Sequence, residues 1–484
     1  MALFGAGIVF TYVTNPFTSF TVVRKPYETE MKPNGQIMLV QLSSPAPHTA
    51  SFYKDVAWVT SGLRIVNNVY TGGKKSNNQD VEHIIDDIHN LRFDSKNPYL
   101  ISGDHFSQLF PRSLGIFYAS LLDPRTARSY TDWLNRQTIY LKTTAYALDV
   151  VARTQSLPTT IVPLGGNNVT TLNIYHPASD TLYSLLYGLR VMMTSEDLET
   201  LYPFPPSSPA VLQTRDAAED LLHQYGKSLT ALFRSYNDAV YDKKTGLVRT
   251  DILLSGTKDV TKRQSSFYDN VIFWKTNQLA QTLSLIPQDP GFLQSLKARI
   301  LETFWLPQEG HFLDDLSREG KTGKWYSSDW LIVLMSGFLD PKNSTEQHYF
   351  TDSVSYIQKH HLDEPFGLKF QEENRANRQY FLPRVFAPDY GGTAIWSNWG
   401  MEYTKLLAIL YDQTSDPSYL VTAKKQIDAY AKNIVIYRGY PEVYAASGVM
   451  FKNLIYKSVR QTGWVVSFEQ ARALVHSVSE HQAL

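Results

Sequence analysis

The stretch that decides the fold is NVIFWKTNQLAQTLSLI, residues 270–286, which is apolar on most of its sides. The next helical stretch, LQSLKARILETF at 293–304, has an apolar face and a charged face. Helices that are apolar all round are buried, whereas amphipathic helices lie at a surface. DWLIVLMSGFL at 329–339 and TAKKQIDAYAKN at 422–433 repeat this alternation. The sequence therefore predicts two concentric layers of helices.

Helical periodicity continues along most of the chain and predicts about eleven or twelve helices. Two segments, YNDAVYDKKTGLVRTD at 236–251 and FWLPQEGHFLDDLS at 304–317, repeat one pattern. Each follows a helix, passes through a glycine turn and ends in extended residues. Such repeated helix pairs are typical of a solenoid or a closed toroid. Strand-like alternation, as in QIMLVQL at 36–42, predicts a small β-rich segment at 1–78 that packs on a helical domain at 79–484.

Composition excludes several classes of function. Lys+Arg and Asp+Glu both number 46, so no net field attracts a nucleic acid or an anionic membrane, and neither is an expected partner. The chain has no cysteine, which excludes thiolate nucleophiles and cysteine-ligated zinc. The N-terminus lacks the basic start of a signal peptide, and polar residues interrupt it too soon for a membrane span, so we expect a cytoplasmic protein. The 30 tyrosines and 9 tryptophans suit the faces and hydroxyl rims of sugars.

Long loops separate the helical stretches, and they concentrate Trp, Tyr, Asp and Gly. Loops of this length are uncommon unless they are functional or disordered. One of them, YRGYPEVYAASG at 437–448, places Glu442 among three tyrosines and outside any helix. Asp269 follows Phe267 and Tyr268 at the start of the apolar helix. Hydrolysis of a glycosidic bond needs two carboxyl groups, so Asp269 and Glu442 are the candidate catalytic pair.

The surroundings of the two acids suggest their roles. Aromatic walls can exclude water from Asp269 and raise its pKa, as a proton donor requires. The phenols of Tyr437, Tyr440 and Tyr444 can orient Glu442 while it stays ionised, as a base requires. The alternative for Asp269 is structural, because an acid in the first turn of a helix also serves the helix cap and dipole.

Further polar and aromatic residues in these loops are candidates for binding a sugar. Helix capping is the alternative for the aspartates, and ordinary core packing is the alternative for the tryptophans. The candidates are Asp104, His105, Arg112, Tyr268, Trp325, Asp329, Trp396, Trp399, Tyr440, Tyr444 and Trp464. The chain lacks HExxH, GxSxG, Walker A and GxGxxG motifs, so we expect neither a metal nor a cofactor.

Three short motifs carry a resemblance to a known family. They are SFYDN at 266–270, IWSNW at 395–399, and Glu442-Val443-Tyr444 followed by TGW at 462–464. With these motifs the chain resembles the (α/α)6-barrel inverting glycoside hydrolases of the trehalase and glycoside hydrolase family 63 type. The resemblance implies a mainly α (α/α)6 barrel in which Asp269 is the general acid and Glu442 the general base.

The resemblance also implies a substrate class. The substrate would be an α-linked glucoside or mannoside, either a small disaccharide or a glycosylglycerate as in the smaller glucosylglycerate and mannosylglycerate hydrolases. An anionic aglycone such as glycerate would need a cationic clamp, which Arg112 or Arg384 can supply. Two alternatives stay open: a phosphorylase or lyase on the same fold, which the Glu442 motif disfavours, and a glycan-binding helical toroid without catalytic activity.

Overall fold

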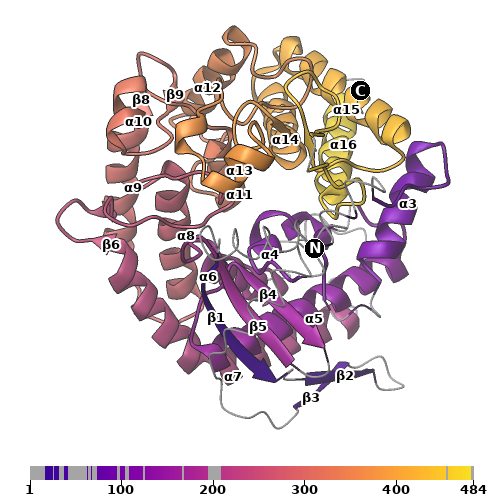
Figure 1. The fold of residues 1–484 in the computed structure, drawn as a ribbon, viewed down its shortest axis with the longest axis vertical. Coiled ribbons are helices and arrows are strands. Elements are labelled where there is room, and N and C mark those ends of the chain that lie inside the picture. Colours follow the sequence, from indigo (N-terminus) through magenta and orange to yellow (C-terminus); the bar gives the residue numbers. More distant parts are fainter. Residues whose placement is uncertain are drawn as a thin grey trace, which may run out of the picture.

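The structure is a computed structural model in which helices form a closed ring (Figure 1). It describes residues 17–24, 27–31, 37–41, 63, 67, 73–94, 97, 99–103, 108–123, 126–165, 168–193, 209–453 and 456–480.

The inner ring of helices is almost wholly buried. Its members are α4 (Ser113–Ile116), α6 (Thr181–Met193), α8 (Phe267–Thr282), α11 (Ile332–Ser336), α14 (Ser397–Thr414) and α16 (Val465–Glu480). Each contacts the next in this order, and α16 returns to α4 through the short 3-10 helix η1 (Ala119–Leu122), which touches both. Helix α8 buries residues on all its sides, including Tyr268, Trp274 and Asn277. The apolar stretch that predicted a buried helix is therefore part of the inner ring.

The outer helices alternate with the inner ones along the chain. They are α3 (Val81–Arg92), α5 (Tyr130–Thr154), α7 (Pro209–Val240), α9 (Pro290–Phe304), α12 (Gln347–Lys359) and α15 (Pro417–Tyr437). Helix α9 shows why such a helix stays outside, because it buries Leu296, Ile300 and Phe304, which recur every four residues on one face. The predicted two layers and the (α/α)6 barrel are confirmed.

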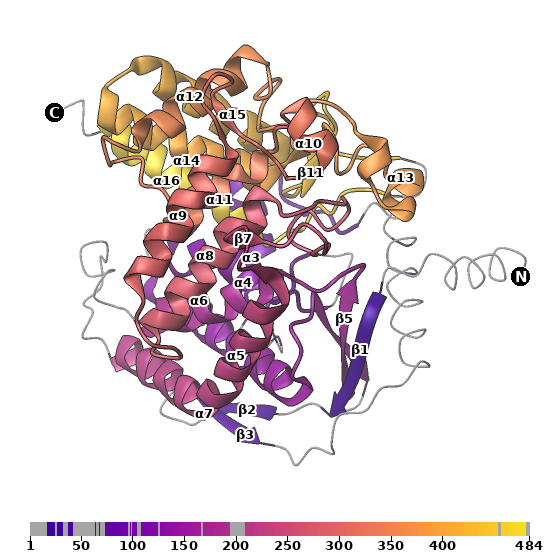
Figure 2. The same ribbon diagram turned by 90° about the vertical axis from the view of Figure 1, so that its left-hand side faces the viewer.

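The two ends of the barrel differ. Connections from an inner helix to the next outer helix are the shorter ones, and the shortest are 283–289 and 415–416. Connections from an outer to an inner helix are long, and they carry the small strands and the short helix α13 (Phe381–Phe386). In Figure 2 these long connections gather along one side of the barrel, to the right of the helices. We call this side the loop face.

The predicted internal repeat appears as two equivalent hairpins on the loop face. β6 (Tyr241–Asp242) pairs with β7 (Leu247–Val248), and β8 (Trp305–Leu306) pairs with β9 (His311–Phe312). Gly246 and Gly310 turn the two hairpins with φ of +72° and +76°, a conformation that glycine adopts without strain. The repeat therefore reflects one helix–hairpin–helix unit used twice.

The N-terminal strand joins the barrel through a sheet. β1 (Phe17–Arg24) pairs antiparallel with β5 (Asn168–Ile174), which pairs with β4 (Thr160–Gly165). A separate hairpin joins β2 (Tyr27–Met31) to β3 (Ile37–Gln41). These strands agree with a β-rich start, while the domain boundary after residue 78 stays a prediction. In the described part of the chain, no helix combines the length and the apolar character that crossing a bilayer requires.

Candidate active site

Glu442 lies on the loop face, where backbone hydrogen bonds fix its position. Its N–H donates to the Val459 carbonyl at 3.0 Å, and its carbonyl accepts from Ser397 N–H at 3.0 Å. It directly precedes β11 (Val443–Tyr444), which pairs with β10 (Ile395–Trp396) at the start of inner helix α14. The backbone of Glu442 is thus held between Ser397, the first residue of α14, and Val459, in the loop that precedes α16 (Val465–Glu480).

The Glu442 carboxyl group meets two phenols. Tyr456 Oη lies 3.5 Å from Glu442 Oε2, and Tyr390 also hydrogen bonds to the carboxyl group. The side chain is half-buried. Burial is the largest cause that raises the pKa of Glu442 to about 7, and the charge of Asp259 adds to it, whereas Arg112 opposes it. A carboxyl group with this pKa exists in both protonation states near neutral pH.

The tyrosines that were expected to orient Glu442 serve elsewhere. Tyr440 and Tyr444 are fully buried, and their ring centroids lie 6.0 and 5.9 Å from that of Tyr430 in the core. The Tyr437 hydroxyl accepts a hydrogen bond from Met450 N–H. The expectation was wrong because the rings nearest in sequence point into the packed interior, where their large apolar area is buried.

Arg112 and Asp259 form an ion pair whose two charges act on Glu442. Arg112 Nη2 lies 2.5 Å from Asp259 Oδ2, and Arg112 Nη1 donates to the Gly256 carbonyl at 2.5 Å. Both side chains are largely buried, at 9% and 15% exposed. Because both ends of the guanidinium are engaged within the protein, Arg112 holds the loop that carries Asp259 against the start of α4.

Asp269 occupies the first turn of α8 in a reciprocal cap. The Ser266 hydroxyl accepts from Asp269 N–H at 3.0 Å and donates to Asp269 Oδ2 at 2.5 Å. The residue is 3% exposed, and its Oδ1 has no hydrogen-bond partner among the residues that the structure describes. Asp269 therefore takes part in the helix cap, the structural role that was the alternative to catalysis, and only its Oδ1 stays without a partner among the described residues.

Tyr268 anchors a neighbouring carboxyl group. Its hydroxyl donates to Asp180 Oδ2 at 2.9 Å and accepts from Thr257 Oγ1 at 2.6 Å. Burial raises the pKa of Asp180 to about 6, against the opposing charge of Arg112. Since Tyr268 is completely buried, it acts on the site by fixing other side chains.

A stack of aromatic rings packs behind Tyr390, one of the two tyrosines at Glu442. Trp464 stacks on Phe117 at 4.5 Å and on Trp396 at 5.9 Å between ring centroids. The Trp396 ring lies 4.9 Å from that of Tyr390, and its indole N–H donates to the Tyr390 carbonyl. Trp396 and Trp464 are therefore brought to the site of Glu442, behind Tyr390. Trp399 is fully buried in the core.

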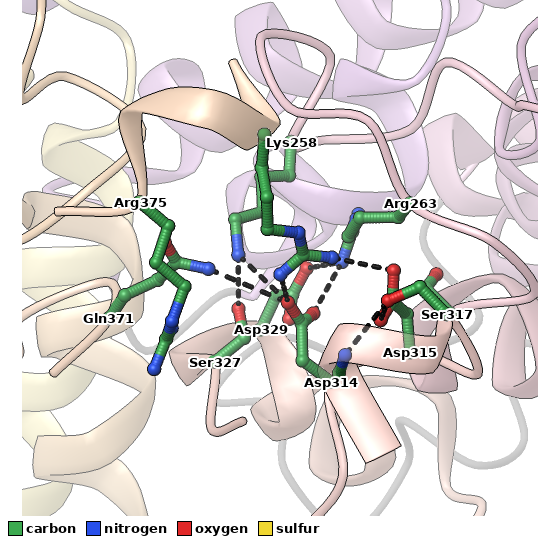
Figure 3. Close-up of polar contacts among 12 residues, drawn as sticks. Lys258, Arg263, Asp314, Asp315, Ser317, Ser327, Asp329, Gln371 and Arg375 are labelled. Atoms are coloured by element: carbon green, nitrogen blue, oxygen red, sulfur yellow. Dashed lines mark hydrogen bonds and ion pairs between the residues drawn. The ribbon is translucent and has the colours of Figure 1, made fainter. Parts of the chain in front are cut away.

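Asp329 belongs to a buried ion network, shown in Figure 3. Asp329 accepts from Arg263 at 2.7 Å, and Arg263 also contacts Asp314 at 3.3 Å. Asp314 lies 3.4 Å from Lys258 Nζ as well, and burial is the largest cause that lowers the pKa of Lys258 to about 8. The network ties together three adjacent long loops, because its members come from 249–266, 305–331 and 360–396.

Guanidinium groups cover the indole of Trp325. Arg378 and Arg375 place their Cζ atoms 4.3 and 4.7 Å from its ring centroid. Arg378 also pairs with Asp314 at 2.9 Å and with Asp315 at 2.5 Å. The ring thus serves as a platform for cations within the network. Asp104 and His105 lie outside the described residues.

Sequence reasoning missed three residues at Glu442. Tyr390 and Tyr456 come from loops that were recognised as functional, yet nothing in their local sequence connects them to Glu442. Asp259 stands in SGTKD at 255–259, and the only feature that could have predicted its importance is the length of the loop that contains it. Within the described residues, no group of three or more histidine or acidic side chains is arranged to hold a metal ion.

Comparison with known proteins agrees with this architecture. No family model matches the sequence, and no curated protein matches it. Among solved structures, the cellobiose 2-epimerase from Bacillus thermoamylovorans B4167 aligns with a TM-score of 0.50 and 11% identity, over 82% of this chain and 100% of that one. A rhamnosidase from Klebsiella oxytoca with rhamnose bound has a TM-score of 0.49 and 11% identity, with coverages of 94% and 82%. For the glucoamylase from Saccharomycopsis fibuligera the values are 0.47 and 12%, with coverages of 85% and 99%. At 11% identity, the likeness to the epimerase is one of fold.

Proposed function

We propose that this protein is a glycoside hydrolase that cleaves an α-linked glucoside or mannoside with two carboxyl groups. The observation that carries the proposal is Glu442, held on the loop face between Tyr390 and Tyr456 with its pKa raised to about 7. Perturbed carboxyl groups are typical of catalytic sites. The barrel fold is shared with a cellobiose 2-epimerase, which supports a sugar as the substrate.

The role of Glu442 follows from its environment. In a two-carboxylate mechanism, one group must be protonated and the other ionised at the working pH. Burial and the neighbouring charge of Asp259 both favour the protonated form of Glu442. We therefore propose Glu442 as the proton donor, the reverse of the role that the family resemblance implies. Asp269 remains the partner proposed from the sequence.

The cationic groups limit how an anionic aglycone could be bound. Arg112 already bridges Asp259 and Gly256, so it would have to leave both to meet a substrate carboxylate. Arg384 is exposed on α13, with its Cζ 5.8 Å from the Phe381 ring centroid. Arg384 is therefore the candidate clamp for glycerate, and a neutral disaccharide needs no such clamp.

A product assay tests the proposed function. The unmodified protein is incubated with a panel of α-linked disaccharides and glycosylglycerates, and the products are followed by proton NMR. We expect release of a free sugar whose first-formed anomer is inverted, and loss of this activity in Glu442→Gln. Conversion of a substrate into an isomer of equal mass would show a sugar epimerase instead. Turnover of no member of the panel would favour a glycan-binding protein.

A further inference from the structure

We infer that Asp259 is the ionised carboxylate that works with Glu442. This inference rests on the proposed function and names the second catalytic group of the same site. It replaces Asp269, which the sequence motif suggested.

The backbone contacts bring the loop of Asp259 to the phenols of Glu442. Val260 accepts a hydrogen bond from Tyr380 N–H at 3.1 Å. Gly391 packs so closely on this loop that a Cβ atom there would lie 2.6 Å from Val260 Cγ2. Gly391 follows Tyr390, whose ring centroid lies 5.2 Å from that of Tyr456. The loop of Asp259 therefore packs against the loop of Tyr390, one of the two phenols at Glu442.

The ion pair of Asp259 and the anchored side chain of the preceding Lys258 together fix the position of Asp259. On one side it forms the 2.5 Å ion pair with Arg112. On the other side, the preceding Lys258 extends into the buried ion network, where its Nζ lies 3.1 Å from Ser327 Oγ (Figure 3). Adjacent side chains anchored in opposite directions leave little freedom to the backbone between them. Asp259 is thus positioned without being sealed, since 15% of its side chain stays exposed.

The charges of Asp259 and Asp269 act on different groups. The charge of Asp259 raises the pKa of Glu442 and also those of Tyr390 and Tyr456, so it acts directly on the cluster around Glu442. The charge of Asp269 acts on Asp180, which Tyr268 anchors deeper in the barrel. Asp259 is held in an ion pair with Arg112, whereas the carboxyl group of Glu442 meets phenols, so the two carboxyl groups stand in the different environments that an acid and base pair needs.

The reaction balances with these two groups. Glu442 transfers its proton to the glycosidic oxygen as the bond from that oxygen to the anomeric carbon breaks. Asp259 accepts a proton from a water molecule as the water oxygen forms its bond to the same carbon. The products are a free sugar and an alcohol, and one water molecule is consumed. Asp259 then releases its proton to solvent, and Glu442 takes up a proton from solvent, which restores the starting state.

Kinetics on two leaving groups test the assignment. The substrates are the disaccharide that the unmodified protein hydrolyses and the matching glycosyl fluoride, whose leaving group needs no proton. General acid or base catalysis contributes about 10²–10⁴-fold, so Asp259→Asn should lose about that much on both substrates. Glu442→Gln should lose it on the disaccharide and keep most of its fluoride activity. Azide, which needs no base, should restore turnover in Asp259→Asn and form a glycosyl azide.

Two further variants act as controls. Asp251→Asn changes an exposed acid of the same loop, whose Arg249 pair lies at 2.6 Å in solvent, and should hydrolyse like the unmodified protein. Asp259→Glu keeps a charge for Arg112 but moves the carboxylate, so it should stay folded and still lose activity. Hydrolysis by Asp259→Asn within tenfold of the unmodified protein would overturn the assignment. So would fluoride activity that survives in Asp259→Asn.

A measurement without substrate separates this inference from the proposed function. Side-chain carbon-13 NMR of glutamate-labelled protein follows the titration of Glu442, whose signal is assigned by its absence in Glu442→Gln. Removing the charge of Asp259 should lower the pKa of Glu442, whereas Asp251→Asn should leave it unchanged. An unchanged titration in Asp259→Asn would refute the pairing even if the protein hydrolyses glycosides. A lowered value would support the pairing even if the panel contains no substrate.

Discussion

Glu442→Gln should stabilise the protein at alkaline pH while abolishing its activity. The pKa of Glu442 is raised from 4.5 to about 7 in the folded protein, mainly by burial. A glutamine resembles the protonated carboxyl group in shape but cannot ionise. The substitution therefore removes the cost of holding a buried carboxylate, which the unmodified protein bears whenever Glu442 is charged.

The sign and the size of the change in the free energy of unfolding follow from this pKa shift. A raised pKa stabilises the fold fully below pH 4.5, and this contribution is lost as the pH rises through about 7. Each pKa unit corresponds to about 1.4 kcal/mol, so the shift amounts to about 3 kcal/mol at pH 8 and to less than about 1 kcal/mol at pH 5. Because part of the side chain stays accessible to water, about 3 kcal/mol is the upper end.

Urea unfolding at about pH 5 and pH 8 measures the effect. The difference in urea midpoint, Glu442→Gln minus the unmodified protein, should be larger at pH 8 than at pH 5. Asp180 has a raised pKa in both proteins and cancels from the comparison. Glu302→Gln, at an acid that is 70% exposed, is the matched control and should show no such change. An equal midpoint difference at both pH values would refute the reasoning.

Three further predictions concern the charges and the packing around the site. Hydrolysis should decline as the pH rises through about 7, because Glu442 then loses the proton it must donate, and a pH–rate profile that instead rises there would assign it as the base. Asp314→Asn should lower the free energy of unfolding by about 3–5 kcal/mol, since it strands buried cations, whereas Asp251→Asn should change it by less than about 1 kcal/mol in the same urea assay. Gly391→Ala should cost about 1–3 kcal/mol by overlap with Val260 and should reduce kcat, and Val260→Ala in the same chain should recover part of both; no recovery would mean that the overlap is not the cause.

Local patterns were sufficient for the architecture. The wholly apolar helix around Trp274 and the one-sided helix around Ile300 differ in periodicity, and that difference already specifies an inner and an outer ring. The long loops and the isolated acid Glu442 likewise identified the face of the barrel that carries the candidate site. These features could be predicted because burial of a helix depends on its own pattern of apolar residues.

Local patterns failed where the partner of a side chain is far away along the chain. Tyr440 and Tyr444 flank Glu442 in sequence, yet the phenols that reach it belong to Tyr390 and Tyr456. Tyr390 belongs to another loop and Tyr456 lies 14 residues beyond Glu442, and only the folded chain brings them to Glu442.

By itself, the sequence determined the helical barrel, its loop face and the acid Glu442, because hydrophobic periodicity and loop length are local properties. Only the tertiary structure decided that Asp269 hydrogen bonds to the helix cap Ser266 and that the charges of Asp259 and Arg112 act on Glu442. It also decided that burial raises the pKa of Glu442 to about 7. The physical reason is that ionisation depends on burial and on charges in space, and segments far apart in the sequence supply both.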